Sequence, residues 1–405
     1  MTSARQKRTR RVRRLALLLF SGYGLIASSA QASDWQMLYR LSDTVTGSDN
    51  IAQIVSSPGP AGSTDASAGL DINLITKSLT WGLTADIGYV TYFGDTELEN
   101  VPRKSVKSDL EKKTRNTDYF VSAFYSIAPA TTTEFTDLGI IENDIERLSY
   151  GADAGFNHRI NKRDSLNFSI GVSRSDFTQA GDDVTPNRSV TASLVWVRQF
   201  NQRVNGNLKT SVNWYEADDP LNQTEFLIYK NTVGTDAKLT RRFSVTANAG
   251  AALIDNYQAD PLFPALGRDR TMVYGFIGDF SLEYKPFNDT TFNFFLAQDV
   301  FTDDLGDLRA SQSARFALNY RISDISSFNL SGGLSKSTGG EDDTDAPREV
   351  WNISPVYSHQ LNKRWNSAIG YRFVQSNGID EFGDPTPITS NTVFVSLSTN
   401  GALLP

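Results

Sequence analysis

The sequence predicts an all-β fold, a transmembrane antiparallel up-and-down β-barrel of about 18 strands. Three observations predict it. Apolar and polar residues alternate with period two along many segments, the connections between these segments alternate between short and long, and the chain opens with a segment typical of exported proteins. Each observation is weak by itself, but bacterial outer-membrane barrels combine all three.

The first 32 residues predict a cleaved signal peptide. Seven Arg or Lys residues lie within positions 5–14, and an apolar run follows as far as Ala30. The run is shorter than the ~20 apolar residues of a spanning helix, and it closes on Ala30 and Ala32, the small-x-small pattern of a signal peptidase site. An uncleaved anchor is the alternative. We therefore expect a signal peptide over 1–32 and an outer-membrane barrel over 33–405.

Period-two alternation recurs along the rest of the chain. In one segment, Leu79, Trp81, Leu83, Ala85, Ile87 and Tyr89 alternate with Thr80, Gly82, Thr84, Asp86 and Gly88. Segments 166–173, 208–215 and 313–321 alternate in the same way. A soluble sandwich would also alternate, but here aromatic residues fall on the apolar face near strand ends, as in the girdles of membrane barrels. Because only alternate residues face lipid, a content of 39% hydrophobic residues is compatible with a membrane barrel.

Short and long connections alternate along the chain. Tight turns are expected near 77–78, 128–129, 161–164, 201–203, 240–242, 286–289, 322–324 and 361–364. Longer loops are expected near 47–65, 94–116, 140–146, 177–187, 217–224, 255–270, 300–310, 336–347 and 377–390. This order gives 18 strands, from a first strand at about 35–46 to a last at 393–398, with both termini in the periplasm. Sixteen strands would result if the first pair or the stretch 117–138 lay outside the wall.

Charge is sorted between the two kinds of connection. The tight turns carry Lys162, Arg163, Arg203, Arg241, Arg242, Lys363 and Arg364. The loops carry Asp182, Asp183, Asp218, Asp219, Asp303, Asp304, Asp307, Glu341, Asp342, Asp343, Asp345, Glu381 and Asp384. We expect these acidic outer loops to be solvated, the alternative being that they gather divalent cations against anionic lipopolysaccharide. No loop has the spacing of a dedicated calcium loop, so no metal site is predicted.

The residue content argues against catalysis and nucleic-acid binding. The chain has no cysteine, which excludes a lipid-anchored lipoprotein, disulfides and cysteine chemistry. Its two histidines, His158 and His359, occupy the same position a few residues before a basic turn. A repeated position favours a structural role at the membrane interface over a general base. A net charge of -7 argues against nucleic acid as a partner. We expect a non-enzyme with no catalytic residue, cofactor or metal.

Strand parity selects nine charged residues that would line the lumen. They are Asp86, Asp153, Arg159, Lys209, Asp279, Glu283, Arg315, Arg321 and Arg372. Barrels of 16 to 18 strands can enclose an aqueous channel, so these residues either converge on a constriction or form scattered ion pairs along the wall. The basic stretch 94–116 carries Lys104, Lys107, Lys112, Lys113 and Arg115. It either folds inward as a constriction or lies outside as a flap.

Two stretches of the chain resemble a known group of proteins. They are the hairpin from Leu148-Ser149-Tyr150-Gly151-Ala152 through Asn161-Lys162-Arg163-Asp164-Ser165-Leu166 to Ser173-Arg174-Ser175-Asp176-Phe177, and the opening Leu41-Ser42-Asp43-Thr44-Val45 with Ser48-Asp49-Asn50-Ile51. Both are similar to proteobacterial outer-membrane β-barrels linked to PEP-CTERM/exosortase and exopolysaccharide systems. The resemblance covers most of the mature chain, and it implies a barrel associated with surface polysaccharide export or display.

The expected function is therefore a non-enzymatic, porin-like channel in the outer membrane, for small solutes or for surface polysaccharide. The alternative is a filled barrel that acts as a structural component of an envelope or exopolysaccharide export assembly. The expected partners are outer-membrane lipid, lipopolysaccharide, the barrel-insertion machinery and polysaccharide export components. Because the first strand begins just after the expected cleavage site, a receptor with an N-terminal plug is not expected.

Overall fold

The regular structure of the described residues is all β. The computed structural model describes residues 34–54, 57–96, 98–129, 146–177, 185–218, 223–259, 268–302, 308–338, 348–379 and 385–404. The strands are β1 Asp34–Ser48, β2 Ala61–Ile75, β3 Leu79–Gly94, β4 Val101–Lys113, β5 Thr117–Pro129, β6 Glu146–Arg159, β7 Asp164–Phe177, β8 Asn187–Gln199, β9 Val204–Asp218, β10 Gln223–Lys238, β11 Phe243–Ala259, β12 Arg268–Phe287, β13 Thr290–Thr302, β14 Leu308–Ser323, β15 Ser326–Thr338, β16 Arg348–Gln360, β17 Trp365–Ile379 and β18 Pro385–Leu404.

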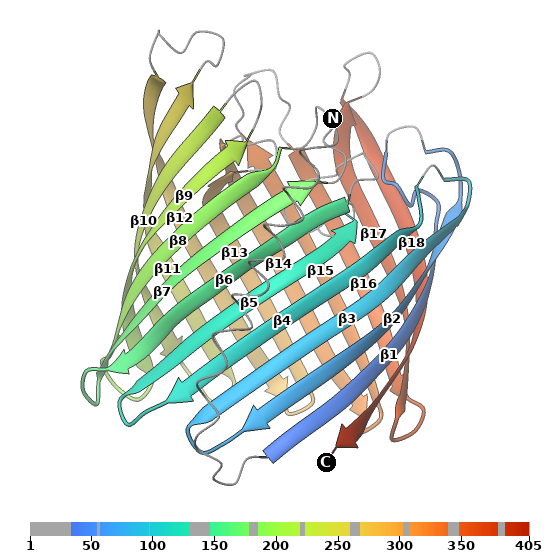
Figure 1. Ribbon diagram of the computed structural model, residues 1–405, viewed down its shortest axis with the longest axis horizontal. Helices are drawn as coiled ribbons and strands as arrows, with labels where there is room; N and C mark the ends of the chain where they lie inside the picture. The colour runs from blue at the N-terminus through green and yellow to red at the C-terminus, as the bar shows by residue number, and fades with distance from the viewer. Residues whose placement is uncertain are drawn as a thin grey trace, which may run out of the picture.

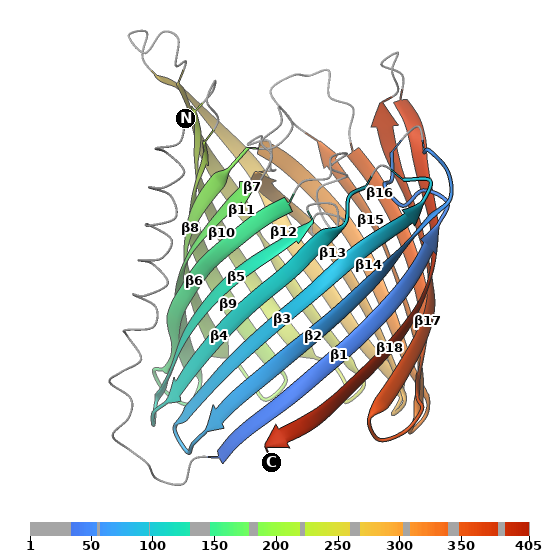
Figure 2. The same cartoon turned by 45° about the vertical axis from the view of Figure 1, so that its right-hand side comes forward.

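These strands form one closed barrel (Figures 1 and 2). Each strand pairs antiparallel with its neighbours in sequence, and β1 pairs with β18 from Ser48↔Thr392 to Met37↔Leu404, which closes the sheet. The predicted fold class is confirmed, with 18 strands in up-and-down order. The start of β1 and the end of β18 lie at the end of the barrel that carries the short turns, called here the short-turn end; the opposite end is the long-loop end.

Side chains of the turn residues build the short turns. In three of them an asparagine accepts hydrogen bonds from the backbone N–H groups two and three residues later. Asn161 Oδ1 accepts from Arg163 and Asp164 at 2.7 and 2.9 Å, and Asn201 and Asn362 repeat the arrangement. Such Asx turns reverse the chain within a few residues and leave the following Lys or Arg exposed. Three basic turns are therefore copies of one motif, whereas in the turn with Arg241 and Arg242 the hydroxyl of Thr240 accepts from the Arg242 N–H at 3.1 Å.

Two of the expected connections are wrong, and the errors compensate each other. Residues 101–113, expected within the loop 94–116, form β4, and the short turn that follows is residues 114–116. The expected turn at 128–129 is instead the end of β5 at the long-loop end. The alternation of β4 is concealed because charged residues occupy positions on both of its faces, so the segment has the composition of a solvated loop. The strand count is unchanged because β4 adds a strand before residue 117, whereas β5 pairs directly with β6 and leaves no place in the ladder for a further strand between them.

The last strand is also longer than expected. Residues 393–398 were expected, whereas β18 runs from Pro385 to Leu404. Its polar end segment lacks a regular apolar pattern, yet it pairs with β1 as far as Leu404. Most of the acidic loop residues, and the expected signal peptide, lie outside the described residues.

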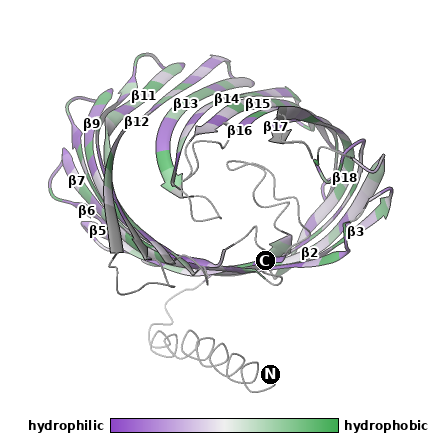
Figure 3. Cartoon of the chain, turned by 90° about the horizontal axis from the view of Figure 1, so that it is seen from above, coloured by the Kyte–Doolittle hydropathy of each residue, from purple (hydrophilic) through white to green (hydrophobic). Residues whose placement is uncertain are grey.

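Hydrophobic and hydrophilic residues alternate along the strands (Figure 3), and the two faces of the sheet differ in chemistry. The apolar residues of the alternating segments face outward and are exposed, as for Ile87 at 63%. The inward positions hold mainly Ser, Thr, Asn and Gly, and serines on neighbouring strands hydrogen-bond directly, as Ser42 does with Ser67 at 2.6 Å. An exposed apolar exterior with a polar interior is the arrangement of a barrel surrounded by lipid.

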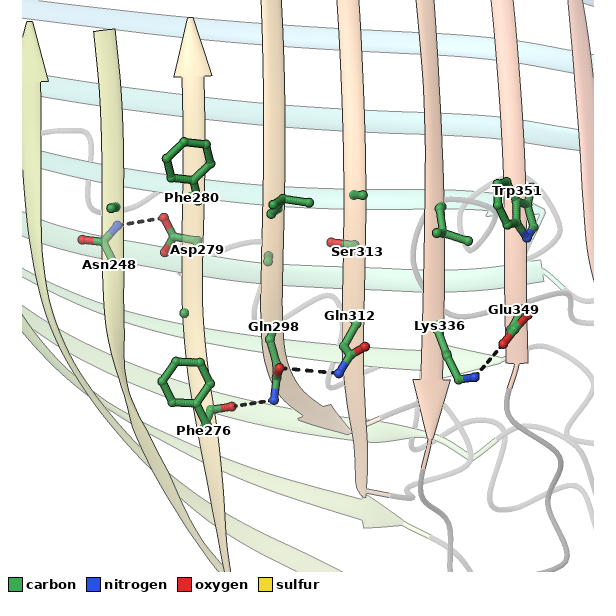
Figure 4. A pocket seen from close by; sticks show the side chains of 16 residues that line it. Asn248, Phe276, Asp279, Phe280, Gln298, Gln312, Ser313, Lys336, Glu349 and Trp351 are labelled. Carbon is green, nitrogen blue, oxygen red and sulfur yellow. Dashed lines mark hydrogen bonds and ion pairs between the residues drawn. The ribbon is translucent and has the colours of Figure 1, made fainter. Parts of the chain in front are cut away.

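The wall is split between β12 and β13 in its long-loop half. The β12–β13 ladder ends at Gly278↔Gln298, although β12 stays paired with β11 as far as Arg268 and β13 stays paired with β14 as far as Thr302. Beyond Gln298, β13 bends away from β12 into the interior (Figures 3 and 4). The term seam is used below for this break between residues 268–277 of β12 and residues 299–302 of β13.

Candidate functional site on the inner wall

A charged cluster covers the inner face of β1 to β4. Arg40 Nε lies 2.9 Å from Asp71 and its Nη2 lies 3.0 Å from Asp86, although β2 separates β1 from β3. The two side chains meet over Gly69, where a Cβ atom would lie 2.3 Å from Asp86 Oδ1. A side chain at this position would therefore separate the pair, which explains why residue 69 is a glycine.

The same cluster continues on β4, in the segment expected to be a loop. Arg103 pairs with Asp65 at 2.9 Å, Lys107 with Asp109 at 3.1 Å and Lys113 with Glu111 at 3.2 Å. The side chains of Lys107 and Asp109 are 58% and 53% exposed although they face inward. Solvent therefore reaches the inner wall in this sector, so side chains do not fill the interior there.

A second inner-wall site lies on β13 to β17, and we call it the arginine hollow. It has a volume of about 620 Å³, and its inward-facing lining includes Arg315, Arg372, Asn293, Asn352 and Phe295. The ladder places Arg315 opposite Gly333 and Gly333 opposite Asn352, so a position without a side chain separates the arginine from the amide. The inward-facing positions of the described parts of β14 to β17 contain no Asp or Glu. The hollow therefore combines two guanidinium groups with neutral amide and hydroxyl groups.

The structure brings two of the nine parity-selected residues together and distributes the other seven. Arg315 and Arg372 share the arginine hollow, whereas Asp86 belongs to the charged cluster on β1 to β4. Asp153 accepts from Ser122 at 3.5 Å, Asp279 accepts from Asn248 at 2.8 Å, Glu283 pairs with Lys285 at 2.7 Å, and Arg321 pairs with Asp289 at 2.6 Å. Lys209 lies on β9 between Val195 and Thr232, and Arg159 lies beside Arg115 in a small hollow at the short-turn end. The parity argument missed Arg40, whose strand shows the same alternation.

The segment that bends inward is the end of β13, and not the basic stretch 94–116, whose residues 101–113 belong to the wall. Asp299 on β13 pairs with Lys230 on β10 at 2.6 Å, across the inner faces of β11 and β12. Lys230 lies opposite Ala252, which lies opposite Gly275, so small residues leave room for this contact. Arg309, at the start of β14, is 1% exposed. Packing thus narrows the interior at the long-loop end beside β10 to β12.

The two histidines make the same contact at the short-turn end. His158 Nδ1 shares a hydrogen bond of 2.8 Å with Thr117, and His359 Nδ1 shares one of 2.8 Å with Ser326. Each hydroxyl belongs to the first residue of the neighbouring strand, directly opposite the histidine in the ladder. Both pairs therefore fasten the start of a strand to its neighbour. Among the described residues, no group of three or more His, Asp or Glu side chains is arranged to hold a metal ion.

Comparisons with known proteins reveal similarity of fold alone. No known protein family matches the chain. No curated protein matches it in sequence. Among solved structures, the FrpB iron transporter from Neisseria meningitidis (F5-1 variant) is 7% identical, with a TM-score of 0.53 over 92% of this chain and 83% of that one. The siderophore receptor PiuA from Acinetobacter baumannii is 9% identical, with a TM-score of 0.51 over 88% and 69%. A BenF-like porin from Pseudomonas fluorescens is 12% identical, with a TM-score of 0.48 over 91% and 99%.

The first two of these structures have the fold of outer-membrane β-barrels, and this chain shares it. Within the described residues, no helix has the length and apolar character needed to span a membrane.

Proposed function

We propose that the chain is a porin-like channel of the outer membrane that passes small hydrophilic solutes and favours anions. In this proposal residues 1–32 are a cleaved signal peptide, the insertion machinery folds the barrel into the outer membrane, and the short-turn end with both termini is periplasmic. The exposed apolar exterior supports the membrane placement, and the basic short turns match the sequence pattern that led to this orientation.

One observation carries the channel proposal: inward-facing charged side chains remain about half exposed inside a closed barrel. Arg40 is 45% exposed, and Lys107 and Asp109 are exposed still further. A filled barrel would bury such groups, because a buried charge is costly unless fully paired. Water in the interior is the simplest way to solvate them, and 18 strands enclose enough space for an aqueous channel.

The arginine hollow supports the preference for anions. In the charged cluster on β1 to β4, basic and acidic groups lie within ion-pair distance and largely cancel each other. In the arginine hollow, by contrast, the charged residues of the lining are Arg315 and Arg372, and both are basic. Guanidinium groups bind carboxylate and phosphate groups through paired hydrogen bonds. Neighbouring Ser and Asn side chains suit a solute that also carries hydroxyl groups, such as an acidic sugar.

Planar-bilayer recording of the refolded protein tests this proposal. We expect stepwise ion conductance, and a reversal potential in a KCl gradient that indicates higher permeability to chloride than to potassium. Heat-modifiable migration on a gel serves as the control for complete folding and insertion. A fully inserted barrel that passes no ions would overturn the channel proposal and would favour the alternative, a structural component of an envelope or exopolysaccharide export assembly.

The link to exopolysaccharide remains a proposal that rests on the resemblance of the hairpins. The inner wall is compatible with it, because hydroxyl and amide side chains can hydrogen-bond to a sugar chain. Block of the ion current by an acidic oligosaccharide, and its absence with a neutral one of equal length, would support transport of an anionic polysaccharide. Equal block by both would indicate that the arginines do not select the solute.

A further inference from the structure

The seam between β12 and β13 is closed by side chains and not by a strand ladder. The backbone carbonyl of Phe276, two residues beyond the last ladder pair of β12, accepts a hydrogen bond of 3.2 Å from the side-chain amide of Gln298. A Cβ atom on Gly275 would lie 3.1 Å from Val300 Cγ2, so Val300 lies against the inner surface of β12. The seam can therefore open by breaking side-chain contacts, without separating paired strands.

A groove runs along the membrane-facing surface beside the seam (Figure 4). It has a volume of about 780 Å³, within the range of roughly 300–1,000 Å³ that is typical of small-molecule sites. Most of its lining belongs to two adjacent rows of outward residues, and it also includes Asn248, Asp279, Ala297 and Ser313 from the inward row between them. The apolar row, nearer the short-turn end, is Ala247, Phe280, Leu296, Ala314, Leu334 and Trp351, each opposite the next in the ladder. The polar row, nearer the long-loop end, includes Gly278, Gln298, Gln312, Lys336 and Glu349 in the same way.

The polar row gives hydrogen-bonding and charged groups at one level of the wall. Gln312 donates to Gln298 at 3.5 Å, and Lys336 pairs with Glu349 at 2.6 Å. These residues face the membrane, where polar groups are stable only at the level of the lipid headgroups. On β13 to β16 the step from the apolar row to the polar row therefore marks the boundary between acyl chains and headgroups, whereas on β12 the exposed rings of Phe276 and Tyr274 continue past it. The seam begins at this boundary, because Gly278↔Gln298 is both its first intact pair and part of the polar row.

An apolar surface continues on the inner side of the seam. Val300 belongs to a buried cluster with Tyr215, Ala217, Phe226, Ile228, Ala252, Ile254 and Ile277 on β9 to β12. This cluster contrasts with the Ser- and Asn-rich inner wall elsewhere. Apolar residues therefore lie on both sides of the seam, at the level where the strands leave the membrane.

We propose that the seam is a lateral opening through which the acyl chain of an outer-leaflet amphiphile passes between the membrane-facing groove and the inner apolar cluster. The groove faces the bilayer, where acyl chains are the material available to fill it. The amides and the Lys336–Glu349 pair complement a zwitterionic headgroup, with its anionic part near the lysine and its cationic part near the glutamate. Open strand edges are not left exposed to lipid, which explains why β13 is folded behind β12 when the seam is closed. The inference rests on the proposed membrane placement, but not on ion conduction.

A disulfide across the seam tests the proposal, because a lipid can be added either before or after the disulfide is formed. The chain has no cysteine, so Gly275→Cys with Val300→Cys introduces the only thiols. The refolded variant is incubated in detergent with palmitoyl lysophosphatidylethanolamine, and native mass spectrometry counts the lysolipid retained per barrel after washing. We expect lysolipid loaded before oxidation to be trapped and lysolipid added after oxidation to be excluded. A reductant should restore exchange.

Ser173→Cys with Ser189→Cys is the matched control, because this inward pair joins β7 and β8 within an intact ladder away from the groove. Its oxidation should leave loading and release unchanged. Three results would each overturn the proposal. The seam variant could retain the same amount of lysolipid whether it is added before or after oxidation, its two cysteines could fail to oxidise, or the unmodified protein could retain no lysolipid. If the seam variant does not fold, the single variant Val300→Ala tests the proposal instead. We expect it to release bound lysolipid faster than the unmodified barrel, and an equal rate of release would contradict the lateral opening. None of these measurements requires the barrel to conduct ions.

Discussion

At the scale of single residues, the inner wall is organised by where side chains are missing as much as by where charges are present. Gly69 lets Arg40 and Asp86 meet across an intervening strand, and Gly333 separates Arg315 from Asn352. The first arrangement pairs opposite charges, whereas the second places a guanidinium group and an amide on either side of an open glycine position. Two sectors of one wall thus have different electrostatic character.

Replacing both arginines of the arginine hollow should reduce anion selectivity. For Arg315→Ala with Arg372→Ala we expect the chloride-to-potassium permeability ratio to fall by roughly five-fold for each charge removed, since one charge acting through water at about 4 Å contributes about 1 kcal/mol. The reversal potential in a KCl gradient measures this ratio. Arg321→Ala is the control, because Asp289 pairs with that arginine at the short-turn end. Equal shifts in the control and in the double variant would contradict a selective role for the hollow.

Some inward glycines are required because an aromatic ring of the neighbouring strand covers them. A Cβ atom at Gly155 would lie 2.2 Å from the carbonyl oxygen of Phe168 and 2.5 Å from Phe120 Cζ. Gly155→Ala should therefore destabilise the barrel by about 1–3 kcal/mol, the usual cost of overpacking. Urea unfolding in lipid vesicles, followed by tryptophan fluorescence, measures the change. Gly47→Ala is the matched control, since nothing lies within 4 Å of a Cβ there; a loss as large in the control would show that crowding is not the cause.

At the scale of elements, the loop after β1 is fastened to β18 on the other side of the closure. The backbone N–H and the side-chain amide of Asn391 donate to the two carboxylate oxygens of Asp49, each at 2.7 Å. Desolvation raises the pKa of Asp49, but the hydrogen bonds from Asn391 and from the backbone N–H groups of Asp49 and Asn50 together outweigh it and leave the pKa below its ordinary value. Asn50 adds a hydrogen bond from its side-chain amide to the carbonyl of Thr389 at 3.2 Å. The closing pair of strands is thus tied at the long-loop end as well as by its ladder.

This tie should depend on pH. The pKa of Asp49 is lowered in the folded protein. The carboxylate of Asp49 therefore contributes fully to the stability of the barrel above the ordinary carboxyl pKa, and this contribution is lost as the pH falls through the lower pKa of the folded state. Asp49→Asn should abolish this pH dependence of stability and should speed hydrogen exchange at the backbone amide of Asn391. The free energy of unfolding should change by less than about 1 kcal/mol, since solvent screens this exposed group. Asp324→Asn, in a short turn at the opposite end, is the control. Unchanged exchange in Asp49→Asn would contradict the tie.

At the scale of the whole molecule, the two faces of each strand meet different solvents. Val395 on β18 faces outward and is 52% exposed, whereas its neighbour Ser396 faces inward opposite Thr44. Val395→Arg should therefore destabilise the barrel in lipid vesicles by about 2–4 kcal/mol, the cost of a cation near the bilayer centre. Ser396→Arg should have a much smaller effect, because its side chain enters the interior. Urea titration of both variants in the same vesicles gives the comparison, and equal losses would contradict the assignment of the two faces.

The outward and inward parity of the strands could be read from the sequence, because a period of two is a local property of the chain. The alternation from Leu79 to Tyr89 and the three Asn-containing basic turns locate strands without knowledge of their partners. Parity also selected Arg315 and Arg372 as inward-facing candidates. It failed at β4, where charged residues on both faces imitate a loop. Their ion pairs reach β2 and positions two residues away on β4, and such partners become visible only when the strands are aligned.

The sequence by itself determined the class of fold, the number of strands and the face on which most residues lie, because each depends on residues close together in the chain. The tertiary structure alone decided which inward residues meet, since residues in one row of the wall can be tens or hundreds of positions apart. It also decided that the wall opens between β12 and β13. Nothing in the local pattern of β13 distinguishes Val300 from an ordinary outward residue. Its inward position depends on the small residues Ala252 and Gly275 of other strands and on the pairing of Lys230 with Asp299.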